Sequence, residues 1–180
     1  MILPAIFGLL AAVFWGTTDF LSRYPSRKIG PAYSTAYVQL FSLVGFTMLV
    51  FYLGPPSFQF LAGGASFLLI DLFVGSLNVM GLMLLYRSFA TGNMSLAAPI
   101  GSTFPIFTIL FGYLLLGQVI GLAKGVAVAI VITGVIISGL NLSPQNVTTK
   151  GATSKLLSTT VILSVLSSIF FGGAYLGLNL

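Results

Sequence analysis

Apolar residues occupy most of the chain in long runs, and short polar segments separate these runs. A transmembrane α-helix needs about 20 predominantly apolar residues. Six runs reach about this length: 2–22, 34–53, 66–90, 96–117, 122–140 and 156–180. Transmembrane β-strands would instead alternate over segments of about ten residues. The pattern therefore predicts an all-α fold, a polytopic transmembrane bundle of about six helices.

The segments between the runs carry turn chemistry, for example Gly54-Pro55-Pro56 and Thr91-Gly92-Asn93. The longest polar segment is 141–155, and we expect it to link two units. The first run has no basic region before it and ends in Trp-Gly-Thr-Thr-Asp rather than in a cleavage site. We therefore expect this run to be retained as a helix and not removed as a signal peptide.

The composition excludes most other classes of protein. Of the 180 residues, 57% are hydrophobic and 5% are charged, whereas soluble domains carry about 25% charged residues. The chain is thus predicted to be a multi-pass protein of the cell membrane with the lipid bilayer as its partner. The net charge of +5 comes from seven Lys and Arg residues against two Asp residues, and the basic residues are too few and too scattered for a nucleic-acid surface.

The chain has few residues that could form a catalytic or metal-binding site. The chain has no Cys and no His, and its two acidic residues are Asp19 and Asp71. A thiolate metal site and most hydrolytic sites are therefore excluded, and no Gly-rich phosphate motif is present. We expect neither an enzyme nor a cofactor nor a bound metal.

A short sequence motif in the first apolar run recurs in the last. Phe14-Trp15-Gly16 in the first run is echoed by Phe170-Phe171-Gly172 in the last, after the polar segment. A unit of five helices that is repeated once becomes inverted in the membrane, because five crossings is an odd number. Inverted repeats are typical of secondary transporters.

Two stretches carry a resemblance to a known family: WGTTDFLSRYPSRKIGP (15–31) and LLYRSFATGNMSLAAPIGSTFPIFTILFGYLLLGQ (84–118). They resemble the EamA branch of the drug/metabolite transporter superfamily. Its members have Trp-Gly at the end of the first helix, a basic residue and Gly before the fourth, and a Pro-containing fourth helix that ends in Leu-Leu-Leu-Gly-Glu. Gln118 stands here in place of that Glu. The resemblance covers 1–140 as one five-helix unit, and 156–180 looks like the first helix of a second, truncated unit.

The resemblance implies half of a ten-helix inverted-repeat fold. It also implies secondary transport of small organic metabolites by alternating access, as efflux or exchange, and a second copy or second half as a partner. The alternative is a non-transporting assembly subunit or an incomplete fragment of a transporter. Transport predicts that Asp19, Asn78 and a break at Pro105 face one common interior. We also expect the first five helices to pack as one unit and the sixth to pack poorly.

The candidate site is built from the polar residues of the apolar runs. Asp19 and Arg23 lie four residues apart on one helical face, with Trp15 one turn earlier, so they form either an interfacial ion pair or part of a cavity. Asp71 complements a helix dipole or starts a polar stripe that reaches Asn78. If transport is coupled to protons, Asp19 and Asp71 are the candidates, because removal from water favours the neutral form of a carboxyl.

Pro105 lies inside the fourth run and removes the usual hydrogen-bond donor to the Gly101 carbonyl. Ser102 and Thr103 stand beside this break, and their hydroxyls can serve the freed carbonyl. Ser42 and Tyr86 are weaker cavity candidates. The residues predicted to line the substrate pathway are Trp15, Thr18, Asp19, Gln39, Asn78, Ser102, Thr103 and Pro105. Small residues also recur every four positions and predict close helix packing, within the chain or between chains: Gly117, Gly121, Gly125 and Ala129.

Overall fold

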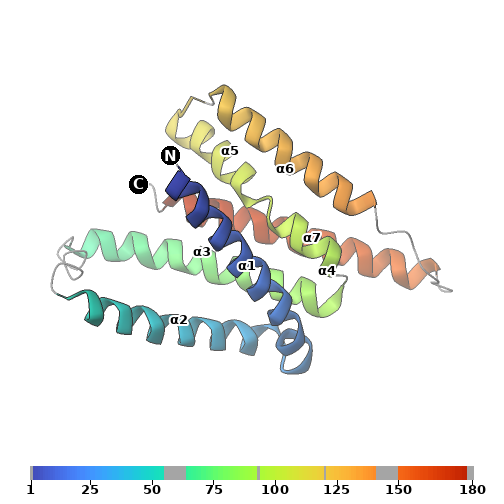
Figure 1. Cartoon of the computed structure of the whole chain (residues 1–180). Helices are drawn as coiled ribbons and strands as arrows, with labels where there is room; N and C mark the ends of the chain where they lie inside the picture. Colours follow the sequence, from blue (N-terminus) through green and yellow to red (C-terminus); the bar gives the residue numbers. More distant parts are fainter. Residues whose placement is uncertain (1, 55–63, 93, 120, 141–149, 178–180) are drawn as a thin grey trace.

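The computed structural model describes residues 2–54, 64–92, 94–119, 121–140 and 150–177, and helices joined by short turns make up these ranges (Figure 1). The predicted all-α fold is confirmed. Most of the linker predicted at 141–155 lies outside the described residues. The helices are α1 (Ile2–Lys28), α2 (Pro31–Leu53), α3 (Gly64–Thr91), α4 (Met94–Gly101), α5 (Phe104–Leu116), α6 (Leu122–Leu140) and α7 (Lys150–Gly177).

Four helical segments in the described part of the chain are long and apolar enough to cross a membrane: Pro31–Leu53, Leu68–Thr91, Met94–Leu116 and Thr159–Gly177. They correspond to the second, third, fourth and sixth predicted runs. The third of these segments contains both α4 and α5, which together form the predicted fourth helix. The spans expected in α1 and α6 stay predictions.

The fourth predicted helix is interrupted next to Pro105, as the sequence indicates. The Ser102 amide still donates to the Ala98 carbonyl at 2.9 Å, but the Thr103 amide donates to the nearer Ile100 carbonyl at 3.1 Å. Pro105 has no N–H with which to continue the helix. The chain therefore leaves α4 at Gly101 and starts α5 at Phe104.

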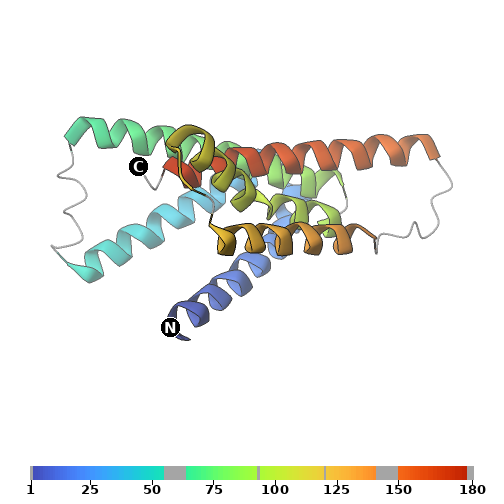
Figure 2. The same ribbon diagram turned by 90° about the horizontal axis from the view of Figure 1, so that it is seen from above.

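The last helix forms the centre of the bundle, and our expectation that it packs poorly is wrong. Its most extensive contacts are with α3, followed by α5 and α4. Figure 2 shows α3 and α7 running together along one side of the molecule, with the N-terminal half of α1 extending away from them. One face of α7 is fully buried, and its members are small and polar: Thr160, Ser164, Ser167 and Ser168.

Small residues explain this packing, because without bulky side chains two helix backbones can approach closely. A Cβ atom added to Gly172 would lie 2.5 Å from the Phe107 Cβ and 3.1 Å from the Phe107 carbonyl carbon. The Ser167 hydroxyl donates to the Gly81 carbonyl of α3 at 2.7 Å. The partners that α7 needs are therefore supplied by α3 and α5.

The fifth predicted helix, α6, is not part of a compact five-helix unit. Its main contacts are with α4, so the expected packing of the first five helices is also wrong. Gly117 ends α5 in the left-handed conformation, with φ of 62°. A Cβ added at Gly117, Gly121 or Gly125 would meet no atom of the described residues within 4 Å. Close packing of this small-residue row within the chain is therefore absent at these glycines, and packing between chains stays a prediction.

Candidate functional site

A cavity of about 800 Å³ lies between α1, α2, α3, α7 and the α4–α5 break. Each of these five parts of the fold contributes side chains to its wall. Its lining residues are Trp15, Thr18, Asp19, Val38, Gln39, Ser42, Leu43, Phe46, Asn78, Leu82, Leu85, Tyr86, Gly101, Ser102, Phe104, Phe171 and Tyr175.

Most of the residues predicted from the sequence lie in the wall of this one cavity. They are Trp15, Thr18, Asp19, Gln39, Asn78 and Ser102, together with the weaker candidates Ser42 and Tyr86. Thr103 and Pro105 do not line it. Pro105 lies in the first turn of α5, and the Thr103 hydroxyl lies 3.3 Å from the Ser168 hydroxyl.

Asp19 is the acidic residue of the cavity wall, and it is partly buried. No hydrogen bond or ion pair to its carboxylate is present among the residues that the structure describes. The ion pair with Arg23 that the spacing suggests is not among the interactions of the described residues, and Asp19 lines the cavity whereas Arg23 does not. The carboxylate is therefore available to whatever enters the cavity.

The second acidic residue, Asp71, lies elsewhere on the protein. It is exposed on α3, about two turns before Asn78, and it does not line the cavity. A second cavity of about 500 Å³ between α3, α5 and α7 is lined by apolar side chains and glycines, and Asp71 is not among them. The structure thus separates the two proton-coupling candidates.

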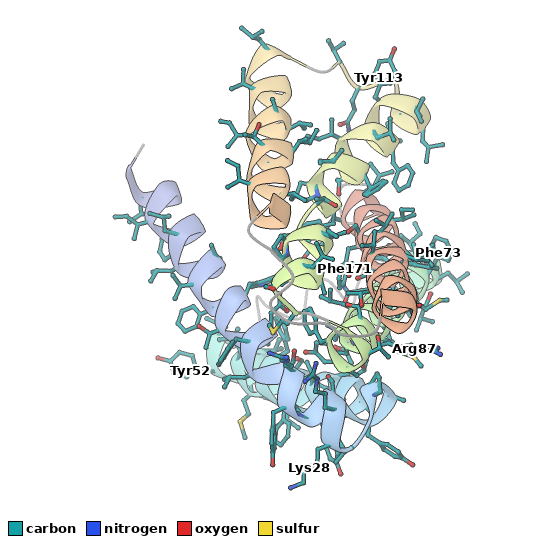
Figure 3. The ribbon with its side chains drawn as sticks, turned by 90° about the vertical axis from the view of Figure 1, so that its right-hand side faces the viewer. Lys28, Tyr52, Phe73, Arg87, Tyr113 and Phe171 are labelled. Atoms are coloured by element: carbon teal, nitrogen blue, oxygen red, sulfur yellow. The ribbon has the colours of Figure 1, made fainter. Side chains whose placement is uncertain are left out.

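Aromatic rings from three helices form one connected cluster in the cavity wall. The Phe104 ring stacks on the Tyr175 ring with centroids 4.8 Å apart, and it meets the Phe171 ring edge-on at 6.1 Å. The Trp15 ring lies 6.1 Å from Phe104 and 6.3 Å from Tyr175. Side chains in Figure 3 show Phe171 directed into the bundle, whereas Arg87 lies at its periphery.

Most of this cluster was not among the predicted site residues. The signal for Phe171 is present in the sequence, since Phe170-Phe171-Gly172 echoes Phe14-Trp15-Gly16. Tyr175 follows Phe171 by four residues, which places both rings on one face of α7. Phe104 has no comparable signal, because a phenylalanine in an apolar run is indistinguishable from a lipid-facing one.

Tyr86 places a buried hydroxyl beside the Asp19 end of the cavity. Its side chain is 1% exposed, and its hydroxyl has no hydrogen-bond partner of good geometry among the described residues. Ser22 and Asp19 are its polar neighbours. A buried hydroxyl without a partner costs free energy, so this atom is suited to contact a polar group in the cavity.

The helix break behind the cavity is held by α7. The Ser168 hydroxyl, which is fully buried, lies 2.7 Å from the Ile100 carbonyl and 3.2 Å from the Gly101 carbonyl. The Thr103 hydroxyl also donates to the Ile100 carbonyl, at 2.7 Å. Ser102 and Thr103, the neighbouring hydroxyls expected to serve the freed Gly101 carbonyl, donate to the Ala98 and Ile100 carbonyls instead, and the approach of Ser168 to Gly101 was not expected.

Protein-family models were compared with the chain. The model of the EamA-like transporter family matches residues 2–140, which include α1 to α6 and every cavity residue except Phe171 and Tyr175. Comparisons with curated proteins and with solved structures gave no match.

Proposed function

The chain belongs to the EamA-like transporter family, and we propose that it is a secondary transporter of small organic metabolites in the cell membrane. In this proposal the substrate crosses by alternating access, as efflux or exchange. The family is one of membrane transporters, so the proposal concerns the substrate, the direction, the mechanism and the particular membrane.

The observation that carries the proposal is the common interior shared by Asp19, Asn78 and Ser102. These residues come from α1, α3 and the α4–α5 break, yet they line one cavity. Polar side chains within membrane spans are costly in lipid and usually mark a substrate or ion pathway. A non-transporting subunit would not need three helices to direct polar groups into a shared space.

Alternating access needs an element with two arrangements, and the α4–α5 break is suited to this role. Discontinuous helices are typical of secondary transporters, where they border the substrate site. In our proposal α5 moves relative to α4 about Ser102 and Thr103, and Asp19 couples the movement to substrate or proton binding. The exposed Asp71 does not take part in this coupling.

We further propose that 1–140 forms the first EamA-like unit, 141–155 the linker, and 156–180 the first helix of a second unit. A second copy or a second half of the transporter then completes the pathway. The packing of α7 onto α3 and α5 is compatible with this division if the two units exchange their first helices.

The full chain in proteoliposomes tests the proposal. A panel of small amines, amino acids and neutral metabolites is screened for protein-dependent flux, with and without a pH gradient. We expect flux of at least one compound, its loss in Asp19→Asn and its retention in the matched control Asp71→Asn. Gradient-driven flux that survives in Asp19→Asn would contradict the coupling role.

A second variant tests the helix break. Pro105→Ala restores a backbone N–H and should reduce flux more than it reduces the amount of folded protein. Unchanged flux would restrict the break to packing. Absence of flux across the whole panel, from protein that retains its helical circular dichroism, would contradict transport and favour the non-transporting subunit.

A further inference from the structure

The charges and rings of the cavity define the chemistry of its ligand, and this inference rests on the function proposed for the same cavity. Asp19 is an acid in the wall, and no Lys or Arg is among the lining residues. Arg27 does not line the cavity and donates to the Phe89 and Gly92 carbonyls at the end of α3. An anionic ligand would therefore meet a carboxylate and no compensating cation.

Two hydroxyl groups of the cavity wall, those of Thr18 and Ser102, present oxygen lone pairs to the cavity. The Thr18 hydroxyl donates its hydrogen to the Phe14 carbonyl at 2.9 Å, and the Ser102 hydroxyl donates to the Ala98 carbonyl at 2.9 Å. A hydroxyl has one hydrogen and two lone pairs. With their hydrogens engaged within their own helices, both groups act toward the cavity as acceptors.

The aromatic cluster adds a surface that favours a cation. Trp15 precedes Asp19 by four residues on α1, so its ring lies on the same face, one turn from the carboxylate. The rings of Phe104 and Tyr175 continue this surface from α5 and α7. Ring faces attract ammonium groups and also pack against apolar bodies.

We propose that the cavity binds a protonated amine with an apolar or aromatic body. The ammonium group donates hydrogen bonds to the Asp19 carboxylate and to the Thr18 and Ser102 hydroxyl oxygens. The apolar or aromatic part of the amine packs on Trp15 and Phe104. The buried Tyr86 hydroxyl, which has no partner of good geometry, contacts the same polar end. A primary ammonium suits this set best, because it supplies three N–H donors to the acceptors.

The chain contains a single tryptophan, and because Trp15 lines the cavity its fluorescence reports binding directly. The purified full chain in nanodiscs is titrated with 2-phenylethylammonium, neutral 2-phenylethanol and anionic 3-phenylpropanoate, which share one ring and differ in charge. We expect a saturable change for the amine and at least about tenfold weaker binding of the other two, as for loss of a charge-assisted hydrogen bond. Equal binding of the anion would overturn the proposal.

Variants locate the ammonium group. Asp19→Asn should weaken amine binding at least about tenfold, Asp19→Glu should restore part of the affinity, and the control Asp71→Asn should bind as the unchanged protein does. Undiminished binding by a folded Asp19→Asn protein would overturn the assignment. The N,N,N-trimethyl derivative of the amine has no N–H, so equal affinity for it would overturn the role of the hydroxyl oxygens.

This titration does not depend on flux. A chain that binds the amine and transports nothing contradicts the proposed function but supports this inference. A chain that transports neutral or anionic metabolites and does not bind the amine overturns this inference alone.

Discussion

Replacing Ser168 with alanine tests how the break between α4 and α5 is stabilised. The Ser168 hydroxyl is fully buried and lies 2.7 Å from the Ile100 carbonyl and 3.2 Å from the Gly101 carbonyl. Hydrogen bonds between transmembrane helices contribute about 0.6 kcal/mol on average and up to about 1.7 kcal/mol. Because Pro105 leaves the Gly101 carbonyl without its usual donor, and the single hydrogen of the Ser168 hydroxyl can be donated to either of these two carbonyls, we expect Ser168→Ala to lower the free energy of unfolding by about 1 kcal/mol.

A double-mutant cycle with Pro105→Ala identifies the cause. Alanine at this position restores an N–H that can reach the Gly101 carbonyl, and a continuous helix would also allow the Phe104 amide to reach Ile100. The cost of Ser168→Ala should therefore fall in the Pro105→Ala background, with a coupling of about 0.5 kcal/mol or more. Unfolding is measured by SDS titration in mixed micelles, followed by helical circular dichroism.

The matched control for this cycle is Ser76→Ala. The Ser76 hydroxyl is exposed on α3 and donates to the Phe73 carbonyl of its own helix, so its removal should change stability little and should not couple to Pro105→Ala. If Ser168→Ala costs the same in both backgrounds, the hydroxyl does not compensate for the break and the reasoning is refuted.

Three further variants test the packing. Gly172→Ala should lower the free energy of unfolding by about 1–3 kcal/mol, because the new Cβ would meet the Phe107 backbone. Gly125→Ala should not lower it, because no described atom lies within 4 Å of a Cβ at that position. Equal stability of the two variants would contradict close packing of α5 on α7. Arg27→Gln should cost about 1 kcal/mol in the same SDS titration, since it removes donors from two carbonyls at the end of α3. Gly16→Leu should leave the unfolding of this chain unchanged, because nothing lies within 4 Å of a Cβ at that glycine.

The helices and the break could be predicted because each depends on local chemistry. Apolar runs of about 20 residues in a chain with so few charges have little alternative to membrane-spanning helices. Pro105 removes an N–H wherever it lies in a helix, so an interruption there follows from the residue itself. The grouping of Asp19, Gln39 and Asn78 could be anticipated in the same way, since polar side chains in such helices turn inward.

The central position of α7 was not predicted, because the repeat assigns this helix to a second unit and so predicts no partners for it among the first five helices. Lipid is as apolar as a leucine side chain, so hydrophobic runs do not say which helix lies at the centre of a membrane bundle. Thr160, Ser164 and Ser167 recur at helical spacing on one face, and all three are fully buried. That spacing was the available signal, and it marks an interface rather than a lipid-facing surface.

The contrast between Gly172 and Gly16 gives the short repeat a physical meaning. Gly172 lets α7 approach the Phe107 backbone of α5, whereas a Cβ added at Gly16 would meet no atom within 4 Å in the described part of the chain. The residues before these glycines, Phe171 and Trp15, line the same cavity. If the echo reflects a repeat, α1 is the counterpart of α7, and Gly16 is predicted to lie against the α5 equivalent of the second unit. Gly16→Leu would then weaken association with that unit while the chain itself folds normally, and undisturbed association would argue that the echo is accidental.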